Sequence, residues 1–272
     1  MPTIKANDIT LAYEQRGNGP HLVLIAGVGY GGWFWHKIGP GLARHFTVTT
    51  FDNRGAGGSD KPAGPYTVDA LAADTAGLLD ALAIQGAAIL GHSLGGYVAQ
   101  RLIATRPDLV GRLILASTNF GGTKVVPISP EALNVLMNRQ GDPLTLIRRG
   151  VEVAAAAGFA EAQPEVVQEL IEYRLGNPVP PAQYTAQVMA GAATLQWTEA
   201  QVAAHLAAIQ VPTLILFGEQ DKVVPVENAY LLAGRIAQSQ VKILPNTGHI
   251  FPIEDPAATI AAITGFLLKV EG

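Results

Sequence analysis

Short apolar runs alternate with segments of helical spacing along most of this 272-residue chain, and this alternation restricts the fold more than any other feature. The runs are four to six residues long, which suits strands that are buried on both faces of a parallel sheet. They lie at 21–26, 46–51, 87–90, 112–116, 213–217 and 241–244. Apolar residues at three- and four-residue spacing occupy 68–84, 94–105, 227–237 and 257–268. The pattern predicts an α/β fold with a wound, mostly parallel sheet.

Two parts of the chain depart from this alternation. Residues 3–15 alternate loosely around Asn7-Asp8, which predicts an antiparallel hairpin at the N-terminus. The segment 121–205 contains no convincing strand but has four helical stretches, at 131–139, 144–157, 165–175 and 182–195. We therefore expect an α/β core made of residues 1–120 and 206–272, with a helical lid of residues 121–205 placed over the sheet.

Charge and composition exclude several classes of function. The 18 basic and 22 acidic side chains give a net charge of −4 without a Lys/Arg cluster, so we expect neither nucleic acid nor an anionic membrane surface as a partner. The chain has no cysteine, which excludes disulfides, thiolate metal sites and a cysteine nucleophile. The N-terminal residues lack a signal-peptide pattern, and no apolar stretch approaches the length of about 18 residues that a membrane span needs. We expect a cytoplasmic protein.

The first of two glycine-rich turns has a pattern that is typical of dinucleotide binding. Residues 27–32 fit G-x-G-x-x-G after an apolar run, and Asp52 ends the next run about 20 residues later, as that fingerprint requires. However, bulky aromatics at 33–35 and Pro40 occupy the expected helix, so close packing of a helix on a pyrophosphate is disfavoured. The alternative is a flexible backbone turn that serves another purpose.

The second turn, Gly91-His92-Ser93-Leu94-Gly95, fits G-x-S-x-G and joins an apolar run to a helical segment. A serine at so sharp a bend adopts a strained backbone, and the flanking glycines leave room for the strand and the helix. Its hydroxyl then projects at the carboxyl edge of the sheet. This pattern predicts Ser93 as a nucleophile.

A hydroxyl nucleophile needs a base and a carboxylate that orients the base. Asp221 follows the run at 213–217, and His249 follows the run at 241–244. Loops after parallel strands open on one edge of the sheet, so we expect both side chains to approach Ser93. Glu219 stands two residues from Asp221 and is the alternative carboxylate.

These motifs, together with the turn at 51–60 and the segment at 248–256, resemble the α/β-hydrolase superfamily over essentially the whole chain. The subgroup that they resemble most is that of lidded carboxylesterases and enol-lactonases of the 3-oxoadipate enol-lactonase type, with the related cofactor-free haloperoxidases. The resemblance implies an oxyanion hole formed by the backbone N–H groups of Val28 and Leu94. Ala26-Gly27 stands where many members have His-Gly.

The resulting expectation is a serine hydrolase that cleaves a carboxylic ester or lactone of a small, largely apolar molecule, with no cofactor and no metal. Two alternatives stay open: a cofactor-free haloperoxidase or perhydrolase on the same triad, and a ligand-binding homologue with slow turnover. Six residues are candidates for the substrate pocket: Trp33, Phe34, Asn119, Phe120, Trp197 and Ile250. Arginines of the segment 121–205, namely Arg139, Arg148, Arg149 and Arg174, are interpreted as surface residues, with a carboxylate clamp as the other reading.

Overall fold

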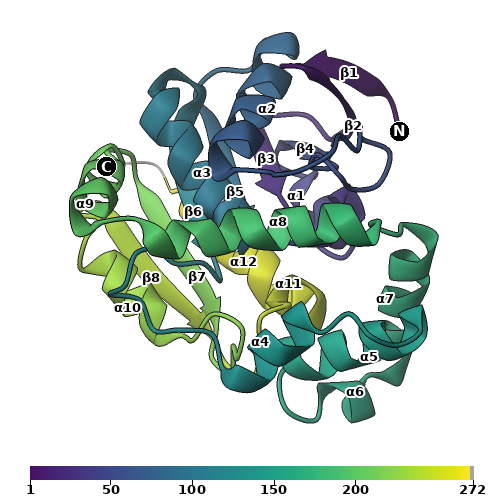
Figure 1. Cartoon of the computed structure of the whole chain (residues 1–272). Helices are drawn as coiled ribbons and strands as arrows, with labels where there is room; N and C mark the ends of the chain where they lie inside the picture. Colours follow the sequence, from purple (N-terminus) through teal and green to yellow (C-terminus); the bar gives the residue numbers. More distant parts are fainter. Residues whose placement is uncertain (270–272) are drawn as a thin grey trace.

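The computed structural model describes residues 1–269 and contains one eight-stranded sheet with the order β1-β2-β4-β3-β5-β6-β7-β8 (Figure 1). The hairpin of β1 (Thr3–Ala6) and β2 (Ile9–Arg16) is antiparallel, and β2 also pairs antiparallel with β4 (Thr47–Phe51). The other neighbours are parallel: β3 (His21–Ile25), β5 (Ala87–His92), β6 (Val110–Ala116), β7 (Thr213–Gly218) and β8 (Ser239–Leu244). The predicted wound α/β sheet with an antiparallel N-terminal hairpin is confirmed.

Helices cover both faces of this sheet because successive strand residues point to opposite sides. In β3, Val23 and Ile25 join the core under α2 (Val68–Ala81), α3 (Leu94–Thr105) and α10 (Glu227–Ala233). Leu22 and Leu24 join the other core, with α1 (Gly39–Leu42), α11 (Phe251–Glu254) and α12 (Pro256–Leu267). The central strands are therefore buried on both faces, as in β3 and β7, and their polar neighbours can be reached at the ends of the strands.

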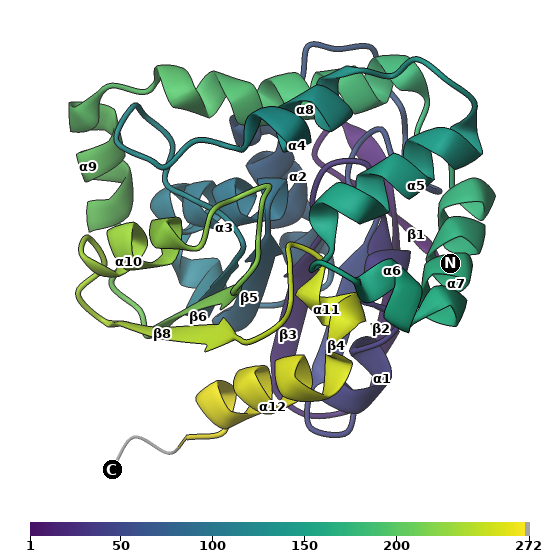
Figure 2. The same cartoon turned by 90° about the horizontal axis from the view of Figure 1, so that it is seen from below.

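Residues 121–205, all of which the structure describes, contain helices and no strand. The helices are α4 (Pro130–Met137), α5 (Pro143–Ala154), α6 (Phe159–Ala162), α7 (Pro164–Gly176), α8 (Pro181–Ala193) and the start of α9 (Glu199–Ala207). Four of them begin with proline, whose fixed φ and missing N–H suit the first helical turn. Figure 1 shows α8 crossing the middle of the molecule with α4 to α7 at the lower right, and Figure 2 shows α8 along the top with α5 to α7 on the right.

Two helices in this region were not expected. The helix α6 has only four residues, too few to show a periodicity. The helix α9 is rich in alanine and runs to Ala207, two residues beyond the expected boundary at 205. It begins at a capping box in which Thr198 and Gln201 satisfy each other's backbone N–H groups.

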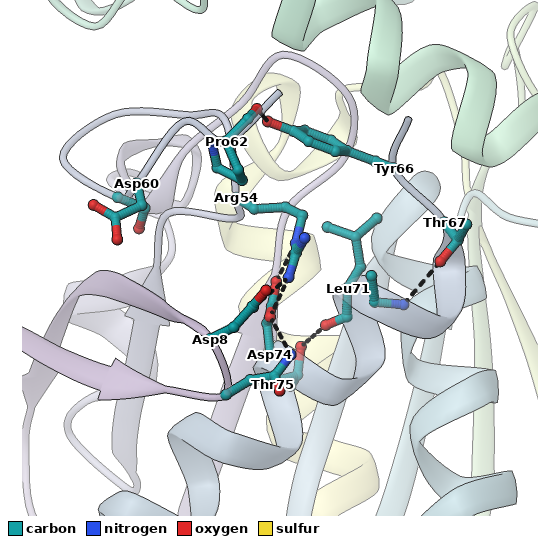
Figure 3. A network of polar contacts seen from close by, with 12 residues as sticks. Asp8, Arg54, Asp60, Pro62, Tyr66, Thr67, Leu71, Asp74 and Thr75 are labelled. Atoms are coloured by element: carbon teal, nitrogen blue, oxygen red, sulfur yellow. Dashed lines mark hydrogen bonds and ion pairs between the residues drawn. The ribbon is translucent and has the colours of Figure 1, made fainter. Parts of the chain in front are cut away.

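The turn after β4 is fixed by two buried carboxylates. Asp52 is 3% exposed and accepts hydrogen bonds from the N–H groups of Gly32 (2.7 Å) and Gly58 (2.8 Å). Asp74 of α2 accepts two from the Arg54 guanidinium, at 2.5 and 2.6 Å, and Figure 3 shows these groups pointing toward each other with Asp8 beside them.

Asp52 therefore ties the turn at 27–32 to the turn after β4. The helices that follow residue 31, a 3₁₀ turn at Gly32–Trp35 and α1, have four residues each. The dinucleotide fingerprint places a longer helix directly after its glycines, and neither of these two helices has that length. Asp52 already accepts hydrogen bonds from two backbone N–H groups of its own chain.

Across residues 1–269, no helix is long and apolar enough to cross a bilayer.

Candidate active site

Ser93 lies at the bend between β5 and α3 with φ 56° and ψ −119°, a left-handed conformation that is strained for a side chain other than glycine. The bend is closed so tightly that a Cβ atom on Gly91 would lie 2.2 Å from the Gly95 carbonyl oxygen. A Cβ atom on Gly95 would lie 2.2 Å from the Ile25 carbonyl oxygen. Glycine is thus required on both sides, and the half-buried serine stands at the carboxyl end of the central strand.

Asp221 and His249 meet at the ends of β7 and β8. Asp221 Oδ2 lies 2.8 Å from His249 Nδ1, and both residues are buried. The other carboxylate oxygen, Oδ1, accepts the N–H groups of Val223 (2.9 Å) and Val224 (2.8 Å). The carboxylate is thereby fixed in orientation. Glu219 is exposed and accepts the Asn246 N–H instead, so the structure places Asp221 and not Glu219 against the imidazole.

Ser93 and His249 line one cavity of about 120 Å³. Within residues 1–269 no hydrogen bond joins the serine hydroxyl to the imidazole. Hydrogen bonds between a nucleophile and its base are often long in an enzyme without substrate, and they shorten in the complex with substrate. The arrangement gives a hydroxyl and an oriented imidazole access to the same bound molecule.

The cavity is bordered by Val28, and the Leu94 N–H is the first of the helix α3. Among the described residues, neither of these two backbone N–H groups has a hydrogen-bond acceptor. The turn at 27–32 lies close to the elbow, which is the bend at Ser93 between β5 and α3, because a Cβ atom on Gly27 would lie 3.0 Å from Ser93 Cβ. Two free donors beside a hydroxyl are the arrangement that stabilises an oxyanion.

Gln187 of α8 fixes this turn, and nothing in the sequence indicated it. Its side chain is 1% exposed and bridges two backbone groups: Oε1 accepts the Gly29 N–H at 2.9 Å, and Nε2 donates to the Arg54 carbonyl at 3.0 Å. A single glutamine in a helix carries no sequence signal. Only the crossing of α8 over the two turns reveals its role.

His92 holds the backbone of His249. Its Nε2 lies 2.8 Å from the His249 carbonyl oxygen, and the ring is fully buried. Burial lowers the pKa of His92 well below its ordinary value, so the ring is neutral. Because a carbonyl only accepts hydrogen bonds, Nε2 carries the proton. His92 is therefore a positioning contact.

Glu254 links the His249 loop to the segment after α5. Its buried carboxylate accepts the Ala156 N–H (2.7 Å) and the Gly248 N–H (2.9 and 3.0 Å). In parallel, the Ala154 carbonyl accepts the His249 N–H at 2.6 Å. Burial raises the pKa of Glu254 to about 7, and the N–H donors only partly oppose this rise. The contact thus joins a titratable group to the loop that carries His249.

We expect this carboxylate to make stability fall with rising pH. Between its ordinary pKa of 4.5 and its folded pKa of about 7, the folded state binds more protons than the unfolded state. The free energy of unfolding, taken relative to that of Glu254→Gln, is therefore highest near pH 4.5 and decreases up to about pH 7, by at most about 3 kcal/mol. Urea unfolding of both proteins between pH 4.5 and 8 measures the difference. The exposed Glu161→Gln variant is the control, and a difference that stays level or grows with pH contradicts the expectation.

The six expected pocket residues do not line the cavity at Ser93. Phe34, Phe120 and Ile250 are at most 1% exposed and belong to the two cores. Asn119 Oδ1 is occupied by the Tyr97 hydroxyl and the Gly121 N–H. Trp33 stacks on Tyr173 with ring centroids 5.4 Å apart, and Trp197 packs against His205.

The walls come from the helical segment instead. Aromatic residues after a strand end are drawn into the core by their apolar area, whereas α4 and α5 cover the elbow with small and aliphatic side chains. These are Ala132, Val135, Leu136, Leu146, Gly150, Val153 and Ala154. The same cavity is lined by Arg139, Arg174 and Tyr184. Within residues 1–269, no group of three or more His, Asp or Glu residues is arranged to hold a metal ion.

Comparison with known proteins identifies the family of this chain. The family model described as "alpha/beta hydrolase fold" matches residues 20–256. A 3-oxoadipate enol-lactonase from Acinetobacter baylyi is 30% identical, with 98% of this chain and 96% of that protein covered. A poly(3-hydroxyalkanoate) depolymerase from Ectopseudomonas oleovorans is 31% identical, with 97% and 91% covered.

A solved structure of a thermophilic esterase from Thermogutta terrifontis superposes with a TM-score of 0.83 at 29% identity, covering 98% of this chain and 97% of the esterase. The family model thus spans most of the chain, and the similarity extends over nearly the whole length of the relatives. This chain belongs to the alpha/beta hydrolase family.

Proposed function

We propose that this protein is a serine hydrolase that cleaves a carboxylic ester or lactone through an acyl-enzyme. The observation that carries the proposal is the 2.8 Å contact between Asp221 and His249 at the cavity that the strained Ser93 also lines. The enol-lactonase, depolymerase and esterase relatives support it.

In the proposed reaction, the Ser93 hydroxyl oxygen attacks the carbonyl carbon and His249 Nε2 takes the hydroxyl proton. Asp221 holds the proton on Nδ1 and stabilises the imidazolium. The N–H groups of Val28 and Leu94 donate to the carbonyl oxygen as it becomes negative, each worth about 3 kcal/mol of the barrier. When the tetrahedral intermediate collapses, the alcohol oxygen leaves with the proton from His249. Water then attacks the acyl-enzyme by the same steps, and the acid is released while Ser93 recovers its proton.

The proposed substrate is small. A cavity of about 120 Å³ is well below the range that drug-sized ligands occupy, about 300–1,000 Å³. Residues 121–205 act as a lid in this proposal, because α4, α5, α7 and α8 supply most of the cavity wall around the elbow.

The test is labelling with a fluorophosphonate probe, followed by peptide mapping. We expect one adduct, on Ser93, that is lost in Ser93→Ala, and we expect acetyl and butyryl 4-nitrophenyl esters to be hydrolysed faster than the octanoyl ester. Ser117→Ala is the matched control, since Ser117 is fully buried and should leave labelling intact. Absence of labelling in the folded protein rejects the proposal.

A further inference from the structure

The charged side chains that line the cavity at Ser93 are both arginines, Arg139 and Arg174. Among the described residues that line it there is no aspartate or glutamate. His92 is the one other basic group besides the triad histidine, and its burial keeps it neutral. A chain with a net charge of −4 thus presents two cations at its candidate active site.

Arg174 of α7 is fixed beside the oxyanion turn. Its Nη1 donates to the Gly29 carbonyl at 3.0 Å, and its guanidinium carbon lies 4.5 Å from the centre of the Tyr30 ring. A guanidinium has five N–H donors, so this one hydrogen bond leaves most of them available. Arg174 forms no ion pair with any residue in the described range 1–269.

Arg139 lies in the loop between α4 and α5, with its guanidinium carbon 4.1 Å from the centre of the Tyr184 ring. In the part of the chain that the structure describes, it forms no hydrogen bond and no ion pair. Burial raises the pKa of the Tyr184 hydroxyl, while the charges of both Arg139 and Arg174 oppose the rise. Both guanidinium groups therefore act on one aromatic ring at the cavity.

Five other arginines of this protein are paired with carboxylates. Ion pairs join Arg16 to Glu14, Arg54 to Asp74, Arg101 to Asp69, Arg106 to Asp80 and Arg235 to Glu199. Arg139 and Arg174 have no such partner among the described residues and line the cavity at Ser93, and a guanidinium matches a carboxylate in shape and charge.

We propose that Arg139 and Arg174 form a subsite for a carboxylate group of the substrate. This subsite rests on the proposed function and defines the substrate class, which is a small ester or lactone whose acyl part ends in a carboxylate. The two arginines hold that carboxylate while the ester carbonyl lies at Ser93. The aliphatic residues of α4 and α5 contact the carbon chain between the two ends.

The test compares 4-nitrophenyl hemiglutarate, which is anionic, with 4-nitrophenyl valerate, a neutral ester of similar length. For the wild type, we expect a higher kcat/KM for the anionic ester. In Arg139→Gln the ratio of the two kcat/KM values falls by about 10-fold, mainly through the KM of the anionic ester, because a hydrogen-bonded charge pair is lost. Arg139→Lys retains part of the ratio. Added NaCl lowers the wild-type ratio and leaves that of Arg139→Gln nearly constant.

Arg148→Gln is the matched control. Arg148 is exposed on α5, lies outside the cavity lining, and its loss changes the net charge equally. A ratio that is unchanged in Arg139→Gln, or that falls equally in Arg148→Gln, overturns the subsite.

A binding measurement separates this proposal from the proposed function. Glutarate is titrated by calorimetry into Ser93→Ala and into the Ser93→Ala, Arg139→Gln double variant, and we expect about 10-fold weaker binding to the second. Equal binding rejects the subsite even if Ser93 is labelled by fluorophosphonate. Weaker binding by the double variant supports the subsite even if no ester is hydrolysed and the hydrolase proposal fails.

Discussion

Asp221→Asn is expected to lower kcat for ester hydrolysis by about 10⁴-fold while the protein stays folded. The reason lies in the contacts of the carboxylate. Oδ1 accepts two N–H groups, from Val223 and Val224, and Oδ2 faces His249 Nδ1. In the variant, the amide oxygen takes the position of Oδ1, so the NH₂ group faces the imidazole and donates to Nδ1. The ring must then carry its proton on Nε2, where it cannot accept the proton of Ser93.

This expectation is measured by steady-state kinetics with a 4-nitrophenyl ester, beside circular dichroism to check folding. Glu219→Gln removes a carboxylate two residues away that has no contact with the imidazole, and should change kcat by less than about threefold. A large loss in Glu219→Gln together with near-normal activity of Asp221→Asn assigns the orienting role to Glu219 and contradicts the triad as proposed.

Asp74→Asn is expected to lower the free energy of unfolding by about 3 kcal/mol or more, since it removes one partner of a buried ion pair. Asp74 is 2% exposed and Arg54 is 7% exposed, and two short hydrogen bonds join them (Figure 3). Burial raises the pKa of Asp74, whereas the hydrogen bonds with Asp74 raise the pKa of Arg54, so the pairing offsets part of the cost of burying both charges. Without Asp74, the buried Arg54 keeps only the exposed Asp8 carboxylate at 3.3 Å as a charged partner, which is costly.

Urea unfolding at pH 7 measures this loss, and the same helix offers the control. Asp69 of α2 is exposed and paired with Arg101, so Asp69→Asn should cost less than about 1 kcal/mol. We also expect the double variant Arg54→Met, Asp74→Leu to regain much of the loss. Equal losses in Asp69→Asn and Asp74→Asn are incompatible with this account.

The rate of ester hydrolysis should also decrease in Asp74→Asn, by more than the fraction of unfolded protein accounts for. The Arg54 carbonyl is one of the two groups that Gln187 bridges, and the other is the Gly29 N–H beside the proposed oxyanion donors. The ion pair, the turn after β4, α8 and the turn at 27–32 thus form one connected path.

The sheet could be predicted from the sequence because its information is local. An apolar run of four to six residues can be buried only between two layers, and the runs at 87–90 and 213–217 lie within β5 and β7. The start of α12 is local in the same way, because Asp255 stands directly before Pro256 and its side chain accepts the Ala258 N–H. The helix α9 was missed because an alanine-rich segment has little amphipathic contrast.

Part of the candidate site could also be predicted from local sequence, and part could not. Ser93, Asp221 and His249 each follow a strand at the carboxyl edge, so topology alone predicts that they come together. The sequence positions of the expected pocket residues did not predict where their side chains lie. Phe34 follows the turn at 27–32 and Phe120 follows β6, yet both are buried in the cores. Whether a side chain faces a cavity or a core depends on helices that pack from elsewhere in the chain.

The sequence by itself determined which candidate side chain follows which strand: a strained serine follows one strand, and an acid and a histidine follow two others. The reason is that the end of a strand fixes where the next residues lie. Only the tertiary structure decided which side chains surround that point. Three of these side chains act through contacts with residues 98 to 158 positions away, namely Gln187, Glu254 and Arg174. Arg139 lies in a cavity wall that several helices share. Such contacts arise from the packing of one surface on another, and no spacing within a single segment encodes them.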